Sequence, residues 1–170
     1  MLTAFLAVIP FLCSKARNTS LGSQWSFKGI ALTYSQKAEY GSFHELYLSA
    51  DMTDLLSGNS RYPGVSAAFS WNIMLKEWEL SDEGYIRAYA GPGAAIGWTT
   101  DKGSGYGVMM GILGKAGLEY ISARKIALSV SISPVLGCHT VWNGNTLRLK
   151  LYKYGLTYSL MPEVGIKYYF

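Results

Sequence analysis

The sequence has 170 residues, which is enough for one domain and short for two. Hydrophobic residues make up 49% of it and charged residues only 15%, against about 25% charged residues in soluble domains. The net charge is +4, but the Lys and Arg residues form no dense cluster, and this argues against a nucleic-acid-binding protein.

The chain begins with a short apolar segment that predicts a signal peptide over residues 1–16. Leu2 to Leu12 is apolar but shorter than the roughly 18 residues that a membrane-spanning helix needs. The small residues Ser14 and Ala16 suit cleavage after Ala16. Acylation of Cys13, as in a lipoprotein, is the alternative. The remaining residues, 17–170, are expected to form one domain.

Beyond the signal peptide the sequence is typical of strands separated by turn-rich breaks, with no helical periodicity. The expected strands are Trp25 to Tyr34, Phe43 to Met52, Gly64 to Met74, Tyr85 to Trp98, Tyr106 to Tyr120, Ile126 to Cys138, Leu147 to Tyr158 and Glu163 to Phe170. Since a bilayer admits only helices or closed barrels, these apolar strands predict an all-β fold: an antiparallel up-and-down transmembrane β-barrel of about eight strands.

The segment from Ile126 to Cys138 shows the alternation most clearly. Ile126, Leu128, Val130 and Ile132 share one face, whereas alanine, serine and glycine dominate the other. A strand of this length is longer than the average soluble strand of about five or six residues and matches a tilted membrane crossing.

Two features conflict with a simple eight-strand barrel. With both termini in the periplasm, the short break from Ser122 to Lys125 would be external and the glycine-rich break from Thr99 to Ser104 periplasmic, the reverse of the usual asymmetry. Either Leu147 to Tyr158 is a loop excursion or one strand is missing. In addition, Pro92 and Pro134 interrupt expected strands and predict bulges or barrel corners.

The last expected strand carries the most specific pattern. Val164, Ile166, Tyr168 and Phe170 alternate on one face, and the last of them is aromatic. This pattern resembles the C-terminal signature of bacterial outer-membrane β-barrels. The resemblance implies that the barrel-assembly machinery recognises this strand.

Two further segments extend the resemblance. Tyr89 to Gly93 and Pro162 to Tyr168 are similar to small porin-family or OmpA-type barrels of Bacteroides-type bacteria. The resemblance implies an integral location in the outer membrane, in contact with its lipid, and little about activity. The sequence departs from OmpA-type proteins because no peptidoglycan-binding domain follows the barrel.

Charged residues gather on the faces that we expect to point into the barrel. They are Glu45, Asp51, Arg87, Lys115, Glu119, Glu163 and Lys167, four acids against three bases. Because an unpaired buried charge is costly, this balance predicts an interior network of paired charges. We expect the network to plug the barrel, together with bulky inward side chains, so that it conducts poorly. These bulky residues are Tyr47, Tyr85, Tyr89, Met109, Leu113 and Tyr169.

Residue types suited to catalysis are sparse. His139 with Ser131 or Ser133 and Glu119 could in principle form a hydrolase or acyltransferase site for membrane lipid, but no motif at fixed spacing supports it. His44 and His139 have no cluster of further ligands, so no metal or cofactor is expected. The leading expectation is a non-enzymatic barrel with a structural or surface-interaction role. A lipid-modifying enzyme, a small-solute porin and a soluble lipocalin-like carrier are the alternatives.

Overall fold

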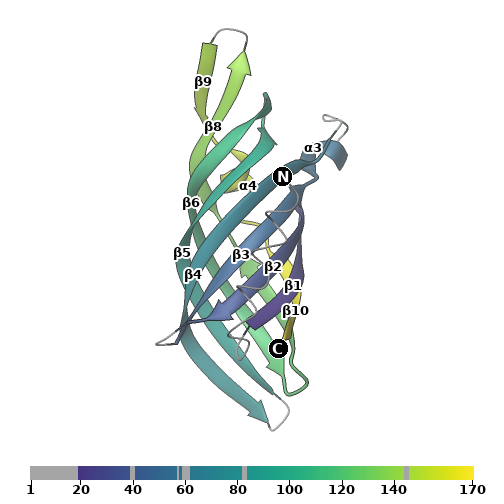
Figure 1. Ribbon diagram of the computed structural model, residues 1–170, viewed down its shortest axis with the longest axis vertical. Coiled ribbons are helices and arrows are strands. Elements are labelled where there is room, and N and C mark those ends of the chain that lie inside the picture. Colours follow the sequence, from purple (N-terminus) through teal and green to yellow (C-terminus); the bar gives the residue numbers. More distant parts are fainter. Residues whose placement is uncertain (1–18, 39–40, 57, 59–61, 82–83, 144–145) are drawn as a thin grey trace, which may run out of the picture.

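An antiparallel ring of eight strands closes into a barrel (Figure 1). The structure is a computed structural model that describes residues 19–38, 41–56, 58, 62–81, 84–143 and 146–170. The expected signal peptide, with Cys13 and the cleavage site after Ala16, lies outside the described residues. The strands are β1 (Thr19–Ser26), β2 (Gly29–Lys37), β3 (Ser42–Asp51), β4 (Gly64–Ser81), β5 (Gly84–Asp101), β6 (Ser104–Ser122), β7 (Ile126–Ile132), β8 (Val135–Asn143), β9 (Thr146–Leu151) and β10 (Glu163–Tyr169), and the short helices are α3 (Thr53–Leu56) and α4 (Tyr154–Thr157).

The first expected strand, Trp25 to Tyr34, is wrong as a single element. The chain turns at Phe27 and Lys28, so that β1 and β2 pair as a hairpin and β1 begins at Thr19. The sequence analysis therefore missed one strand of the ring, because it merged β1 and β2 into one. With this strand included, the turn after Ser122 lies at the end of the barrel that holds Phe170, and the β5–β6 turn lies at the opposite end (Figure 1). Both turns are short, since two residues join β5 to β6 and three join β6 to β7.

The expected strand from Leu147 to Tyr158 is only half a strand. β9 ends at Leu151, and the chain then leaves the wall in an excursion, residues 152–162, that contains α4 before it returns as β10. β9 pairs with β8 alone, beyond the part of the wall where β10 pairs with β7. The eight strands of the ring are therefore β1 to β6, β7 continued by β8, and β10.

Pro134 interrupts the line of β7 and β8 without shifting the register. Both strands pair with β6 in the same register on either side of the break. Proline has no N–H to donate to the ladder, whereas its carbonyl oxygen still accepts a hydrogen bond from Gly114 N at 3.0 Å. β5 likewise keeps its register through Pro92. The bulges expected at the two prolines are therefore wrong, and the first irregularity of β4 lies between Met74 and Lys76 instead.

The pairings close the barrel with a shear of ten residues. The row of paired residues starts on β6 at Met110, passes through Ile96, Ala67, Leu48, Leu32, Ser23, Ile166 and Leu128, and returns to β6 at Tyr120, ten residues further along the strand. For eight strands with ordinary spacing and rise, this shear corresponds to a strand tilt of about 40°. A ring of this size is only wide enough for side chains to fill.

The two faces of the wall have opposite chemistry. The outward positions carry large exposed apolar side chains, and Leu32, Leu128 and Ile166 are 62%, 53% and 41% exposed. The inward positions carry polar and charged side chains, and Glu45 and Glu119 are both fully buried. This confirms the alternation expected from the sequence and places the apolar surface outside the barrel. One cluster of buried apolar side chains lies where the 152–162 excursion packs, and it consists of Ala95, Met109, Leu113, Val135, Tyr152 and Tyr154. Other buried apolar side chains, such as Phe43 and Ile121, lie outside this cluster.

Gly91 lies where the backbones of β4 and β5 approach each other closely. A Cβ atom at this position would lie 1.9 Å from the carbonyl oxygen of Trp71, which no side-chain rotation can relieve. We expect Gly91→Ala to lower the free energy of unfolding by at least about 1–3 kcal/mol. A Cβ atom at Gly114 would have Pro134 Cγ, 4.0 Å away, as its nearest neighbour. Gly114→Ala should therefore change the free energy of unfolding by less than about 0.5 kcal/mol. Urea titration of the refolded protein in detergent measures both, and equal effects would contradict the pairing of β4 with β5.

Candidate functional site

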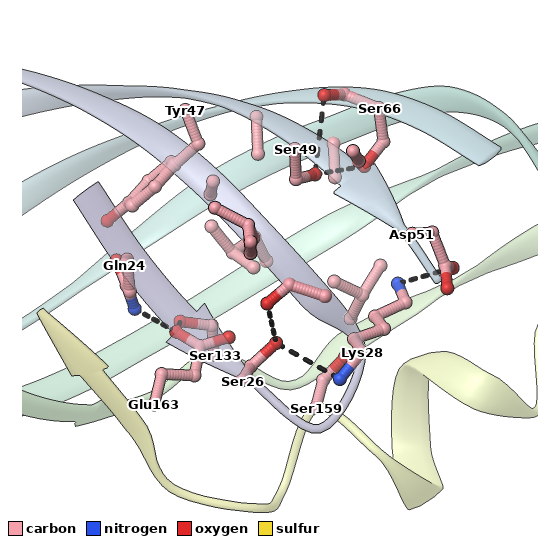
Figure 2. A pocket seen from close by; sticks show the side chains of 18 of the residues that line it. Gln24, Ser26, Lys28, Tyr47, Ser49, Asp51, Ser66, Ser133, Ser159 and Glu163 are labelled. Atoms are coloured by element: carbon pink, nitrogen blue, oxygen red, sulfur yellow. Dashed lines mark hydrogen bonds and ion pairs between the residues drawn. The ribbon is translucent and has the colours of Figure 1, made fainter. Parts of the chain in front are cut away.

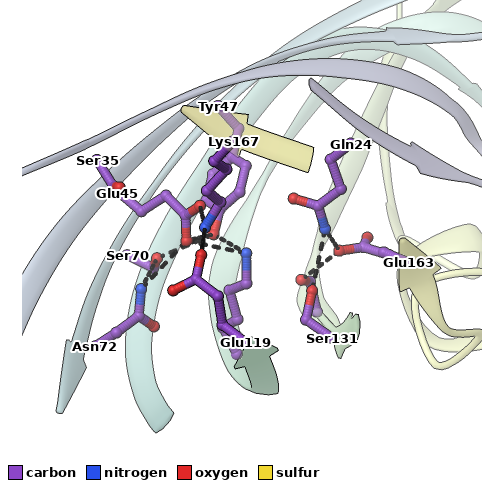
Figure 3. Close-up of polar contacts among 12 residues, drawn as sticks. Gln24, Ser35, Glu45, Tyr47, Ser70, Asn72, Glu119, Ser131, Glu163 and Lys167 are labelled. Carbon is purple, nitrogen blue, oxygen red and sulfur yellow. Dashed lines mark hydrogen bonds and ion pairs between the residues drawn. The ribbon is translucent and has the colours of Figure 1, made fainter. Parts of the chain in front are cut away.

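A chain of alternating charges crosses the middle of the barrel. Its five members come from four strands: Glu45 from β3, Arg87 from β5, Lys115 and Glu119 from β6, and Lys167 from β10. The order of contacts is Lys115, Glu45, Lys167, Glu119, Arg87, so that each charge lies beside charges of the opposite sign. Figure 3 shows Lys167 lying between Glu45 and Glu119.

The distances along this charge chain are those of direct ion pairs. Lys167 Nζ lies 2.7 Å from Glu45 Oε1 and 3.1 Å from Glu119 Oε1. Lys115 Nζ lies 3.1 Å from Glu45 Oε2, and Arg87 Nε donates to Glu119 Oε2 at 2.6 Å. All five residues are buried, so water does not screen these attractions.

Two tyrosines add hydrogen bonds to the charge chain. The Tyr47 hydroxyl donates to Glu45 Oε2 at 2.7 Å and accepts a hydrogen bond from Lys115. The Tyr169 hydroxyl donates to Glu119 Oε2 at 3.1 Å and accepts one from the Arg87 guanidinium. Each carboxylate thus has a phenol as well as cations around it. From the sequence, both tyrosines were expected only to fill space inside the barrel, and their hydrogen bonds to the charged residues were missed. Their inward positions, two residues from Glu45 and from Lys167, could have indicated this role.

Glu163 lies apart from the charge chain. The structure brings together five of the seven residues expected in the interior network. Asp51 lies beside Lys28 instead, and the Glu163 carboxylate accepts hydrogen bonds from Gln24 and from Ser133, the latter at 2.8 Å. Gln24 Nε2 also donates to Ser131 at 3.1 Å, as Figure 3 shows. The sequence alone did not indicate Gln24 as a partner, because it gives no depth within the barrel.

A small cavity lies beside Glu163, and its lining extends to Lys28 and Gly29 at the β1–β2 turn (Figure 2). Its volume of about 90 Å³ has room for a few water molecules. Both serine hydroxyls and apolar side chains line it; the lining includes Ser26, Ser49, Ser66, Ser133, Ser159, Met109, Leu113 and Val135. Ser49 and Ser66 are hydrogen-bonded to each other at 2.6 Å, so part of this polar wall is already satisfied.

Lys28 closes the cavity from the β1–β2 turn. Its Nζ lies 4.0 Å from Asp51 Oδ2 and 4.9 Å from the centre of the Tyr152 ring. Burial lowers the pKa of Lys28, and the attraction of Asp51 offsets only part of this effect. Asp51 also accepts a hydrogen bond from the Thr99 hydroxyl at 2.8 Å. These contacts hold the turn over the excursion that contains α4.

The residues considered for catalysis do not come together. His139 is opposite Met109 on β6, whereas Glu119 lies ten residues further along that strand, roughly 30 Å away. The imidazole Nε2 lies 2.9 Å from the Thr99 carbonyl oxygen, to which it donates, and the ring stacks on Tyr152. The sequence hypothesis of a triad of His139, Glu119 and Ser131 or Ser133 is therefore wrong in geometry.

The other histidine points outward. His44 stacks on Phe69, with 5.5 Å between the ring centres, and lies beside Trp71. In the described part of the chain, no group of three or more potential metal ligands comes together. No helix among the described residues is long and apolar enough to cross a membrane.

The residues of the expected assembly signal all lie on the outer face of β10. Val164, Ile166, Tyr168 and Phe170 are exposed there, and the rings of Tyr168 and Phe170 meet edge to face. β10 pairs with β1 on one side and with β7 on the other. It is therefore the strand that closes the ring.

Lys167 is the member of the charge chain whose loss should cost most. Lys167→Met leaves Glu45 and Glu119 facing each other without the cation between them, and we expect the free energy of unfolding to fall by about 3–5 kcal/mol. The exposed Lys102 provides the control, and Lys102→Met should change this free energy by less than about 0.5 kcal/mol. Urea unfolding in detergent measures both variants. A loss below about 1 kcal/mol for Lys167→Met would show that the charge chain contributes little to stability.

Comparison of the chain with protein-family models, characterised proteins and solved structures finds no match.

Proposed function

We propose that this chain is an integral barrel of the bacterial outer membrane with a structural or surface-interaction role and no catalytic activity. One observation carries the proposal: the apolar outer face continues around the whole ring, while the interior is polar and paired in charge. The row from Met110 to Tyr120 points outward on every strand of the ring, and most of its members are large and apolar.

The energetics favour lipid as the surroundings of this surface. Moving one fully exposed leucine or isoleucine side chain out of water contributes about 1.5–3 kcal/mol, and the outer face carries many of them. A soluble carrier barrel would need the reverse arrangement, with its apolar side chains inside. Lipid contact also accounts for the exposed aromatic residues Trp71, Trp98 and Tyr168.

The pattern of the last strand supports the outer membrane in particular. The alternation of Val164, Ile166 and Tyr168 on the outer face of β10 resembles the pattern that the barrel-assembly machinery reads in outer-membrane barrels, and β10 has both of its neighbours in the ring. The tight turn at Arg124, on the same end as Phe170, suits the periplasmic side.

An arginine on the outer face tests the lipid contact. Leu32 on β2 and Leu147 on β9 are both 62% exposed, but only Leu32 lies in the apolar row around the ring. In lipid vesicles we expect Leu32→Arg to lower the free energy of unfolding by about 2–4 kcal/mol and Leu147→Arg by less than about 1 kcal/mol. Similar costs at the two positions, together with solubility of the protein without detergent, would contradict the proposal.

Planar-bilayer recording tests whether the barrel is closed. Because the charge chain crosses an interior that is only wide enough for side chains, we expect no stable conductance of general-porin size from the refolded protein. Lys167→Met should add brief openings at most, since Tyr47 and Tyr89 still fill the lumen. Steady porin-like conductance of the unmodified protein would instead indicate diffusion of small solutes as its function.

A further inference from the structure

β9 leaves one edge of the sheet open. Within the described part of the chain it has a neighbour on one side only, β8, and stands at the end of the strand order. The β8–β9 hairpin projects beyond the ring at the end away from Phe170 (Figure 1). All six residues of β9 are exposed. An exposed edge strand presents unpaired N–H and C=O groups with which another chain can pair.

The register identifies the backbone groups at this open edge. Tyr152 N donates to the Gly137 carbonyl at 2.9 Å, so this pair is a hydrogen-bonded one. Hydrogen-bonded and non-bonded pairs alternate along an antiparallel ladder. Leu151 opposite Cys138 is therefore a non-bonded pair, as are the pairs of Leu149 and Leu147 further along β9. The N–H and C=O groups of these three leucines point away from β8, toward the open edge.

The side chains of β9 divide into an apolar face and a cationic face. The three leucines share one face and are at least half exposed. Arg148 and Lys150 share the other face, where Lys150 Nζ donates to Ser104 Oγ at 3.2 Å. Among the described residues, neither cation has a carboxylate within ion-pair distance. The edge thus offers regular hydrogen-bonding groups together with two unneutralised positive charges.

The charges of Arg148 and Lys150 decide which kind of strand can pair with the open edge of β9. In any antiparallel pairing of two β9 strands that keeps the leucines on one face, the cationic faces of the two copies meet. In the symmetric register about Leu149, Arg148 of one copy lies opposite Lys150 of the other. Like charges directly opposite each other destabilise a strand pair, whereas opposite charges stabilise it. A second copy of this chain is therefore disfavoured, and an acidic strand is favoured.

We propose that the open edge of β9 binds an extended acidic segment of a partner protein by adding it to the sheet as a further strand. Acidic side chains at alternate positions of the segment face Arg148 and Lys150, and the apolar side chains between them extend the leucine face. The inference rests on the proposed surface-interaction role. It does not depend on the location of the barrel in lipid, so peptide binding can fail while the Leu32→Arg experiment succeeds.

Peptide binding to the full-length protein, refolded in detergent, tests the charge requirement. The probes are two fluorescein-labelled heptapeptides, one of alternating valine and glutamate and one of alternating valine and lysine, and fluorescence anisotropy is the readout. We expect the acidic peptide to bind at least about tenfold more tightly than the basic one. The double variant Arg148→Glu, Lys150→Glu should reverse this preference. Equal binding of the two peptides, or an unchanged preference in the double variant, would overturn the proposal.

A proline at Leu149 tests the edge itself. Because Leu149 N–H points to the open side, Leu149→Pro removes an edge donor and no hydrogen bond of the β8–β9 ladder. Leu149→Ala keeps the donor and serves as the matched control. We expect Leu149→Pro to weaken binding of the acidic peptide about tenfold and Leu149→Ala less than about threefold, with circular dichroism unchanged in both. Equal affinities of the two variants would exclude strand addition.

Two further outcomes would overturn the proposal in favour of another occupant. If phosphatidylglycerol vesicles bind the protein and the double charge variant abolishes this binding without affecting the acidic peptide, the cations serve lipid headgroups instead. If sedimentation shows a dimer that Leu149→Pro dissociates, the occupant is a second copy of the chain.

Discussion

The fold depends on neutralising two carboxylates in a space too narrow for bulk water. Glu45 and Glu119 lie on β3 and β6, which are not neighbours in the ring, and both reach Lys167 on β10. The attraction therefore acts across the lumen and complements the hydrogen bonds that join each strand only to the next one. Arg87 and Lys115 complete the alternation, so that each carboxylate lies beside two cations.

The wall provides the room that this arrangement needs. A shear of ten residues on eight strands fixes the radius, and inward glycines then decide where large side chains fit. A Cβ atom at Gly117 would lie only 2.7 Å from the Tyr89 hydroxyl, so the tyrosine fills space that a larger residue on β6 would occupy. Small and large inward residues on neighbouring strands thus pack against each other inside the barrel.

The sequence predicted the faces of the strands well and their ends poorly. Alternation with period two is local, so it assigned inward and outward positions on β5, β6, β7 and β10 directly. The sequence analysis missed the turn at Lys28 because the turn takes only two residues and the alternation of apolar residues resumes directly after it. Gly29 follows this turn with a φ of +147°, and a glycine at this position was the signal that could have indicated the turn. β9 misled for a different reason. Apolar residues keep alternating past Leu151 but in the opposite phase, at Tyr152, Tyr154 and Leu156, and the strand ends where the phase changes.

The sequence predicted which residues point into the barrel but not how far along the barrel axis each of them lies. Glu163 and Lys167 share a face of β10, but they are four positions apart, which is roughly 13 Å along the strand. Glu163 therefore contacts Gln24 and Ser133 instead of the charge chain. The position of Lys167 also links the charge chain to closure of the ring. Glu45 and Glu119 share this cation, so neither carboxylate has all its partners until β10 lies between β1 and β7. An open barrel therefore leaves both carboxylates in need of water, and closing the ring removes that need.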